Sequence, residues 1–209
     1  MCNETVVTGN DFTTTDEYTY AFVYSSIGSQ IIDNRFNGES LKLVLTYSHE
    51  SIVRNNVFSD GGIRLFSCLK VTVDQNMIHH GSIDVDVSHA TKITRNTISQ
   101  NSEAPALVFE GASMNYVSKN IMEDCFAGIR LERSRFNTFM KNSVINCGEI
   151  PVWFSNSLLN LWARNYRGKP VGLLYRIPGE FRIPRQWPLA PIIIPVFTFD
   201  LFSKSTTLQ

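Results

Sequence analysis

The sequence has no excess of charge, no long apolar run and no paired cysteine motif. Its 209 residues carry 19 basic and 19 acidic side chains, so the net charge at pH 7 is zero. Phosphate recognition needs clustered Lys and Arg, and this balance argues against nucleic acid as the main partner. No apolar run reaches the roughly 18 residues of a spanning helix, so no membrane span is expected.

The cysteine and histidine residues of the sequence indicate neither a structural metal site nor a disulfide scaffold. The four cysteines are too few to scaffold a chain of this length, and none belongs to a CxxC pair. The four histidines are expected on the surface or in loops, so no metal site is predicted. A hydrophobic fraction of 43% and a charged fraction of 18% exclude a disordered chain. No basic-then-apolar leader opens the sequence, which indicates a processed chain or a part of a larger one.

What the chain does have is an asparagine repeat. Its pattern is an apolar residue, two variable residues, Asn, one variable residue and a second apolar residue, as in Val53–Asn56–Phe58. Successive copies of the Asn lie 20 to 24 residues apart. The repeated asparagines are Asn10, Asn34, Asn56, Asn76, Asn96, Asn120, Asn142 and, in an imperfect copy, Asn165.

A pair of alternating apolar residues precedes each Asn from the second onward. The first member of the pair lies 13 residues before its Asn in all seven cases, whereas the gap from an Asn to the next pair varies from 7 to 11 residues. A constant block and a variable gap indicate one rigid unit and one tolerant loop. The pairs are Ala21 and Val23, Leu43 and Leu45, Ile63 and Leu65, Ile83 and Val85, Leu107 and Phe109, Ile129 and Leu131, and Val152 and Phe154.

These blocks predict an all-β, right-handed parallel β-helix solenoid of about seven coils. Alternate side chains of a strand share a face, and each coil is too short to bury its apolar face except against the next coil. Helical repeats need a longer period and a 3.6-residue pattern. We expect the asparagines to form a ladder at a tight turn, where Asn tolerates left-handed geometry and its amide can bond both neighbours. The predicted ladder comprises Asn34, Asn56, Asn76, Asn96, Asn120 and Asn142.

The segment after the repeat differs in composition. Six of the eight prolines lie between residues 169 and 202. Proline cannot donate to a β-ladder and suits the edge of a sheet, and the open end of a solenoid needs cover. We therefore predict a β-helix over residues 1–168 and a Pro-rich capping segment and tail over 169–209, with a binding extension as the alternative. The first repeat begins part-way through a coil, which favours contacts with missing N-terminal coils.

The repeats resemble a known group. The Gly-Ile-x-Leu strands at 62–65 and 128–131 and the Ile-x-x-Asn-x-Ile turn are similar to repeats of the NosD-like, carbohydrate-binding and sugar-hydrolase superfamily of parallel β-helices. The resemblance covers roughly residues 5–167, and segment 160–170 is similar to the tail of surface β-helix proteins of that group. It implies an extracellular or cell-surface location. NosD-like proteins are associated with copper delivery, but no His/Met/Cys cluster here supports that role.

Equivalent positions in successive coils should stack, which brings distant charged residues together on the outside of the leading strands. Asp84 and Asp86 lie two apart on one strand, about 7 Å from each other on one face. Glu110 and Glu132 should continue the row in the next two coils. The full candidate face for carbohydrate or calcium is Asp84, Asp86, Glu110, Glu132, Arg64, Arg130, Phe66 and Trp153.

Three interpretations of this face are open. Stacked carboxylates raise one another's pKa, which could supply an acid beside a base for polysaccharide cleavage, while aromatic side chains could line a sugar groove. A calcium site is a related option, since calcium prefers oxygen ligands. The third interpretation is a solvated face whose charges pair across coils, each pair contributing less than about 1 kcal/mol. No full catalytic signature is present, so the catalytic residues are unassigned.

Two cysteines occupy equivalent positions in neighbouring coils. Cys125 and Cys147 each lie five residues after their Asn, so their Cα atoms should be about 5 Å apart, inside disulfide range. They are either stacked free thiols or a disulfide, which would favour an extracytoplasmic location.

The sequence therefore predicts a non-catalytic surface or extracellular β-helix module that binds a polysaccharide or other glycan or serves a structural role. A carbohydrate-active enzyme using Asp84, Asp86, Glu110 and Glu132 is the first alternative. A NosD-like metal-delivery protein is the second. No cofactor is predicted apart from the calcium option.

Overall fold

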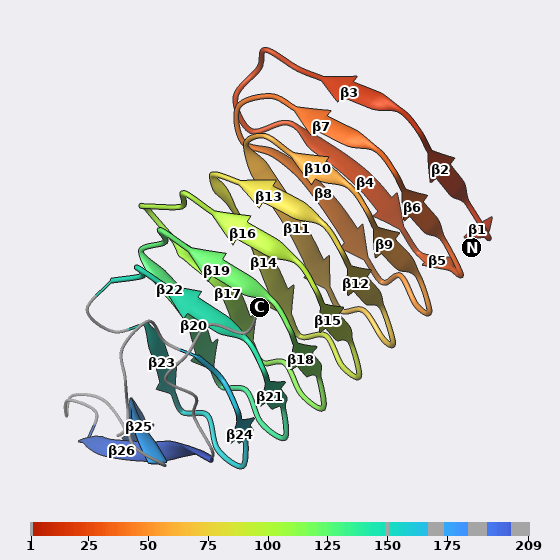
Figure 1. The fold of residues 1–209 in the computed structure, drawn as a ribbon. Helices are drawn as coiled ribbons and strands as arrows, with labels where there is room; N and C mark the ends of the chain where they lie inside the picture. Colours follow the sequence, from red (N-terminus) through yellow and green to blue (C-terminus); the bar gives the residue numbers. More distant parts are fainter. Residues whose placement is uncertain (1, 149–150, 167–173, 184–191, 202–209) are drawn as a thin grey trace.

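The computed structural model describes residues 2–148, 151–166, 174–183 and 192–201, and this part of the chain contains strands but no helix. Short parallel strands are stacked along one axis, from the red N-terminal coil to the blue C-terminal strands (Figure 1). The protein is thus a parallel β-solenoid of about seven coils, as the repeat predicts. No helix among the described residues could cross a membrane.

Each coil contributes three strands. The first carries the alternating apolar pair, and these strands form what we call the leading sheet. Its members are β4 (Tyr20–Tyr24), β8 (Leu41–Thr46), β11 (Gly61–Phe66), β14 (Gly81–Asp86), β17 (Pro105–Glu110), β20 (Ala127–Glu132) and β23 (Val152–Ser155).

The other two strands flank the repeated Asn. The strand before it belongs to the middle sheet, which contains β2 (Val6–Thr8), β6 (Gln30–Ile32), β9 (Ile52–Arg54), β12 (Thr72–Asp74), β15 (Lys92–Thr94), β18 (Tyr116–Ser118), β21 (Thr138–Met140) and β24 (Leu161–Ala163). The strand after it belongs to the third sheet, which contains β3 (Asp11–Thr13), β7 (Arg35–Asn37), β10 (Val57–Phe58), β13 (Met77–His79), β16 (Thr97–Ser99), β19 (Ile121–Glu123) and β22 (Ser143–Ile145). A short pair, β1 (Cys2–Asn3) and β5 (Ser26–Ile27), lies at the N-terminal end.

The asparagine ladder is continuous from Asn10 to Asn165. At each step the side-chain Nδ2 and the backbone N–H of one Asn donate to Oδ1 of the next, as from Asn56 to Asn76 at 3.0 Å. The same Nδ2 also donates to a carbonyl of the preceding coil, as from Asn56 to Ile31 at 2.9 Å. These bonds join every pair of neighbouring coils at one corner.

One expectation about this corner is wrong. The left-handed geometry falls not on the ladder Asn but on the residue before it, for example Asn55 with φ 55° and Gln75 with φ 55°. Those side chains are exposed. The reversal of the chain at this outer residue turns the following Asn inward, where its buried amide can be satisfied by the neighbouring coils.

The interior is a stack of like residues. The apolar pair of each leading strand and the two apolar residues around the Asn point inward, and they are buried except at the N-terminal end of the stack, where Val7, Phe12, Ala21 and Val23 are only partly buried. Aromatic rings stack directly in two places, Phe12–Phe36–Phe58 with centroids 4.9 and 4.6 Å apart and Phe139–Trp162 at 4.2 Å. In the first coil the equivalent side chains are only partly buried, because they have a neighbour on one side.

The proline-rich tail contributes two strands at the end of the stack. Strands β25 (Leu174–Ile183) and β26 (Ile192–Leu201) pair antiparallel. β25 continues the leading sheet beside β23, and β26 continues the middle sheet beside β24. These pairings cover strand edges of the last coil, as expected of a cap. The predicted boundary between residues 168 and 169 lies outside the described residues.

Candidate functional site

The outward side chains of the leading sheet form two columns in the predicted register. Arg64 pairs with Asp84, and Phe66 with Asp86, at the β11–β14 step. The register continues through β17, β20 and β23. The first column is Phe22, Val44, Arg64, Asp84, Val108, Arg130 and Trp153, and the second is Tyr24, Thr46, Phe66, Asp86, Glu110, Glu132 and Ser155.

The two aspartates of the face are held by cations from earlier coils. Lys42 Nζ lies 3.1 Å from Asp84 Oδ2, across two coils, and Ser82 Oγ donates to Asp84 Oδ1 at 2.8 Å. Arg64 Nε and Nη2 lie 2.8 and 2.7 Å from Asp86 Oδ2. Both carboxylates are therefore ion-paired, in agreement with charge pairing across coils.

The two glutamates are ion-paired as well, Glu132 with an arginine of its own strand and Glu110 with one from the following coil. Arg130 Nη2 lies 2.9 Å from Glu132 Oε2, and Arg133, from the corner after β20, pairs with Glu110. These pairs are half exposed, so each stabilises the fold by less than about 1 kcal/mol. Their effect on the site is to neutralise its charge, which leaves none of the four carboxylates without a cation.

Asp86 nevertheless stands out among these carboxylates. Burial raises the pKa of its carboxyl, and the charges of Asp84 and Glu110 raise it further, while the hydrogen bond and charge of Arg64 act in the opposite direction. The net pKa is higher than that of an ordinary Asp. This carboxyl therefore takes up a proton more readily than an ordinary Asp, a shift in the direction that a general acid needs.

Aromatic side chains cover the N-terminal end of the face. Phe22 and Tyr24 are 66% and 65% exposed, far more than large apolar groups normally are. Tyr47 lies edge-on to Tyr24 at 5.8 Å and to Phe66 at 6.1 Å, so three rings form a continuous surface. Tyr47 was not predicted, because it follows its strand at the corner, outside the alternating columns.

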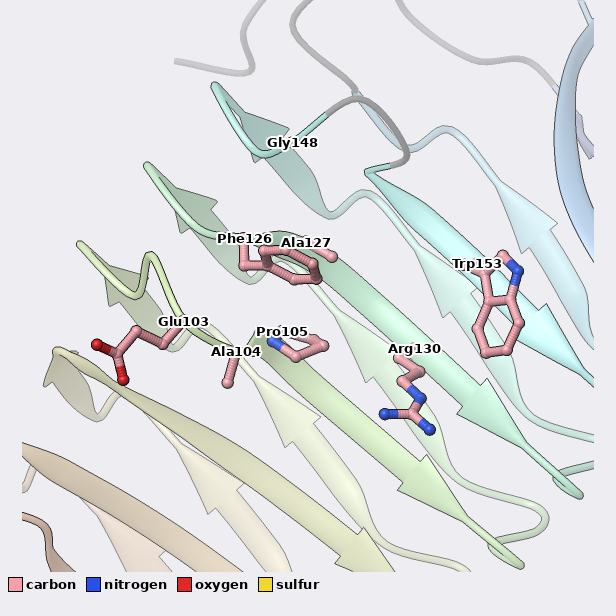
Figure 2. Close-up of a pocket in the computed structure, with 8 residues that line it drawn as sticks. All are labelled: Glu103, Ala104, Pro105, Phe126, Ala127, Arg130, Gly148 and Trp153. Carbon is pink, nitrogen blue, oxygen red and sulfur yellow. The ribbon is translucent and has the colours of Figure 1, made fainter.

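A groove of about 820 Å³ lies at the C-terminal end of the same face. Figure 2 shows Trp153 and Arg130 at one end of the groove and Glu103 at the other, with Phe126 and Pro105 between them. The Arg130 guanidinium lies 5.8 Å from the centroid of the Trp153 ring. The groove is lined by Glu103, Ala104, Pro105, Phe126, Ala127, Arg130, Gly148 and Trp153.

Only Arg130 and Trp153 of this groove were predicted. Phe126 and Glu103 lie in the connections between the third sheet and the leading sheet, whose lengths vary from coil to coil. The one signal in the sequence is the gap of 11 residues between Asn96 and Leu107, which is among the longest. It indicates a protruding loop but not which side chain the loop presents.

The four carboxylates of the face do not converge as the calcium option would require. Among the described residues, no group of three or more His, Cys, Asp or Glu side chains converges as a metal site would require. His79 and His89 each pair through Nδ1 with a serine hydroxyl of a neighbouring coil, Ser99 at 2.9 Å and Ser113 at 2.8 Å. Cys125 and Cys147 are buried and free.

Comparisons with known proteins agree with this architecture. The family model described as "NosD: Periplasmic copper-binding protein (NosD)" matches residues 3–167. A crystal structure of a "putative glycosyl hydrolase" from Parabacteroides merdae is similar with a TM-score of 0.50 and 10% sequence identity, over 66% of this chain and 82% of that one. At this identity the likeness concerns the fold alone.

A second structure, of trypsin-treated QnrB1 (R167E), a plasmid-mediated fluoroquinolone resistance protein, has a TM-score of 0.22 and 8% identity over 77% of this chain and 84% of that one. That score is too low to support any argument. No curated protein matches the sequence.

Proposed function

This chain belongs to the NosD family, and from that membership we propose that it is a β-helix module of the periplasm or cell surface that binds a polysaccharide without cleaving it. The family is described as periplasmic, which supports a location outside the cytoplasm. The observation that carries the proposal is the groove, which is lined by Trp153 and Arg130 of the leading sheet and by Phe126 of the connection before it.

The chemistry of the groove suits a sugar ring. A pyranose presents one face of C–H groups, which packs against an indole or benzene ring, while its hydroxyls bond to charged groups at the ring edge. Trp153 and Phe126 supply the rings, and Arg130 and Glu103 supply a donor and an acceptor. A groove of mostly apolar lining with a few polar groups is typical of small-ligand sites.

The face also has the length for a polymer. Six strand pairings separate β4, which carries Tyr24, from β23, which carries Trp153. At about 4.8 Å for each coil, the two aromatic ends lie roughly 29 Å apart. A linear chain of several sugars would contact aromatic rings at both ends and the paired charges between them. Each of the four carboxylates is engaged in an ion pair and is not free to act as an acid or base, which favours binding over catalysis.

The test is a glycan-binding screen followed by calorimetry with the full chain. Trp153→Ala should weaken binding of the selected polysaccharide at least tenfold, because it removes the largest ring of the groove. Tyr116→Ala is the matched control, since Tyr116 is an exposed aromatic residue on the middle sheet, and it should bind like the wild type. If no acidic or neutral polysaccharide binds at millimolar concentration, the proposal is wrong.

A carbohydrate-active enzyme is the second candidate, favoured by the raised pKa of Asp86 beside Glu110. Cleavage would then be lost in both Asp86→Asn and Glu110→Gln while the thermal midpoint is unchanged. Product formation by the wild type, measured as new reducing ends, distinguishes this candidate from binding alone.

Copper does not fit the described residues. They contain no group of three or more His, Cys, Asp or Glu side chains that could hold a metal ion, and the neighbouring soft ligands are two buried thiols, Cys125 and Cys147. Their proximity and burial strongly raise the pKa of Cys147, which opposes the double deprotonation that a dithiolate site needs. The metal-delivery alternative predicts about one copper for each chain by elemental analysis after dialysis.

A further inference from the structure

Cys125 and Cys147 occupy the same position in successive coils. They follow β19 and β22, which pair with an offset of 22 residues from Ile121–Ser143 to Glu123–Ile145. The pairing continues past the strands, since Asp124 N–H donates to Ile145 O and Gly148 N–H donates to Cys125 O, both at 3.1 Å. The two cysteines are therefore directly stacked, with Cα atoms about 4.8 Å apart, within the range of disulfides.

The two side chains also share one orientation. Each thiol donates to the carbonyl two residues earlier, Cys125 to Glu123 O at 3.2 Å and Cys147 to Ile145 O at 3.3 Å. Both belong to the buried core, so the two thiols lie side by side along the stack and interact with each other. A hydrogen bond from the Cys147 thiol lowers the pKa of Cys125, whereas this bond and burial raise that of Cys147.

Such a pair presents one thiol whose pKa is lowered by its neighbour and a second sulfur directly beside it. This is the arrangement that thiol–disulfide exchange requires. Cys68, in contrast, has serines above and below it. Its backbone N–H donates to Ser88 Oγ at 2.9 Å, and no thiol lies beside it among the described side chains.

We propose that Cys125 and Cys147 form an intramolecular disulfide that links two adjacent coils when the protein folds in an oxidising compartment. The oxidant is an external disulfide, which accepts the two electrons that the cysteine pair loses. The Cys125 thiolate attacks one sulfur of the oxidant and expels the other as a thiolate. The Cys147 thiolate then attacks the Cys125 sulfur and releases the second oxidant thiolate. The two protons of the cysteines pass to the oxidant, which leaves as a dithiol.

The bond would cross-link the coils that carry Phe126 and Gly148, the residues that follow the two cysteines and line the groove. It closes a loop of the unfolded chain and thereby lowers the entropy of the unfolded state. Because the bond reduces the entropy of the unfolded chain, the melting temperature of the oxidised protein should be roughly 5–10 °C above that of the reduced protein.

The experiment uses the full chain with Cys2→Ser and Cys68→Ser, which leaves only the pair. The protein is refolded from urea with either oxidised glutathione or dithiothreitol, then unfolded and alkylated. We expect the oxidised sample to be lighter than the reduced one by about 2 Da before alkylation, to bind no alkylating agent and to remain monomeric. Two alkylated thiols after oxidative refolding, or a disulfide between chains, would overturn the proposal.

Single variants separate the pair from the other cysteines. In the wild-type background, Cys68→Ser should keep the difference in melting temperature between oxidised and reduced samples, while Cys147→Ser should lose it. Should Cys147→Ser fail to fold, the mass measurement on the variant that retains only the pair still decides the question. The result is independent of sugar binding, which is measured separately.

Discussion

At the scale of single residues, the ladder asparagines carry more of the structure than any other polar group. Asn56 is fully buried, and its Oδ1 accepts hydrogen bonds from both the backbone N–H and the Nδ2 of Asn34. Its own Nδ2 donates to Ile31 O and to Asn76 Oδ1. A hydrogen bond contributes only about 1 kcal/mol, but an orphaned buried donor costs about 1–3 kcal/mol. Each ladder position is therefore intolerant of change.

Replacement of Asn56 tests this directly. Asn56→Ala leaves two donors of Asn34 without their acceptor, so we expect the free energy of unfolding to fall by about 3 kcal/mol. The neighbouring Asn55→Gly is the matched control. Asn55 is exposed with φ 55°, a geometry that glycine adopts without strain, so its effect should be within about 0.5 kcal/mol. Urea unfolding measures both, and equal effects would contradict the role of the ladder.

Two buried aspartates should respond to pH in opposite directions. Burial opposes ionisation of Asp74, but hydrogen bonds from Arg95 and Thr94 and the charge of Arg95 outweigh it and lower the pKa. The stability that Asp74 contributes is therefore present above the unfolded pKa of about 3.9 and is lost as the pH falls through the lower folded value. For Asp86 the folded pKa is raised, so its contribution is present below about 3.9 and is lost as the pH rises through the folded value.

The corresponding variants give a clear expectation. Asp74→Asn should lower the melting temperature at pH 7, and the difference from the wild type should shrink near pH 3, because the wild-type carboxyl is then close to protonation. Asp86→Asn should be better tolerated at pH 7, since it removes a charge whose burial is unfavourable. Melting curves at the two pH values check both. A deficit of Asp74→Asn that is the same at pH 3 and pH 7 would refute the ionic account.

At the scale of the strands, the backbones of neighbouring coils come so close at the start of β11 and β14 that these positions require glycine. Gly61 of β11 and Gly81 of β14 are paired, and a Cβ at Gly81 would overlap the carbonyl oxygen of Gly61. A Cβ at Gly81 would point at the backbone of the neighbouring coil, 1.5 Å from the Gly61 oxygen, so only glycine fits there. Gly111 differs, since its φ is 58° but a Cβ there would meet nothing closer than 3.7 Å.

These two glycines separate packing from backbone strain. Gly81→Ala forces β11 and β14 apart, and we expect a loss of at least about 3 kcal/mol of stability or a failure to fold. Gly111→Ala, with open space but left-handed geometry, should cost about 1–2 kcal/mol. Denaturant unfolding of the two variants provides the comparison. A larger loss in Gly111→Ala would mean that strain, not close approach, governs these positions.

At the scale of the whole molecule, stability should be a sum over coils and their nearest neighbours. Nearly all strand pairings join a coil to the next one along the axis (Figure 1). Phe36 and Phe58 stack at 4.6 Å in adjacent coils, while Phe139 lies several coils away. A solenoid of this kind transmits a perturbation mainly to the adjoining coils.

A pair of double-mutant cycles measures this property. Phe36→Leu and Phe58→Leu remove two rings in contact, and we expect a coupling energy of at least about 0.5 kcal/mol. Phe58→Leu and Phe139→Leu change rings that do not touch, and their effects should add within about 0.3–0.5 kcal/mol. Both cycles rest on free energies of unfolding in urea. Equal coupling in the two cycles would show that the coils do not behave as independent neighbours.

The site was predictable only where it follows the strand register. Because Asp86, Glu110 and Glu132 lie on paired strands, counting from the ladder Asn places them side by side. Phe126 and Glu103 could not be placed in this way, since they lie in connections of variable length.

A second asparagine column, Asn115, Asn137 and Asn160, donates through Nδ2 to the next member in the same manner as the first. Its spacing of 22 and 23 residues is a signal of the coil period that the sequence itself carries.

The sequence by itself determined the coil, its period and the residues that point inward, because strand pairing at a constant offset imposes a strict alternation of buried and exposed positions. Only the tertiary structure decided which loop residues form the groove, that Lys42 reaches Asp84 across two coils, and that the left-handed residue precedes the ladder Asn. Loop paths and long side chains have no fixed period, so their neighbours are set by packing in three dimensions rather than by distance along the chain.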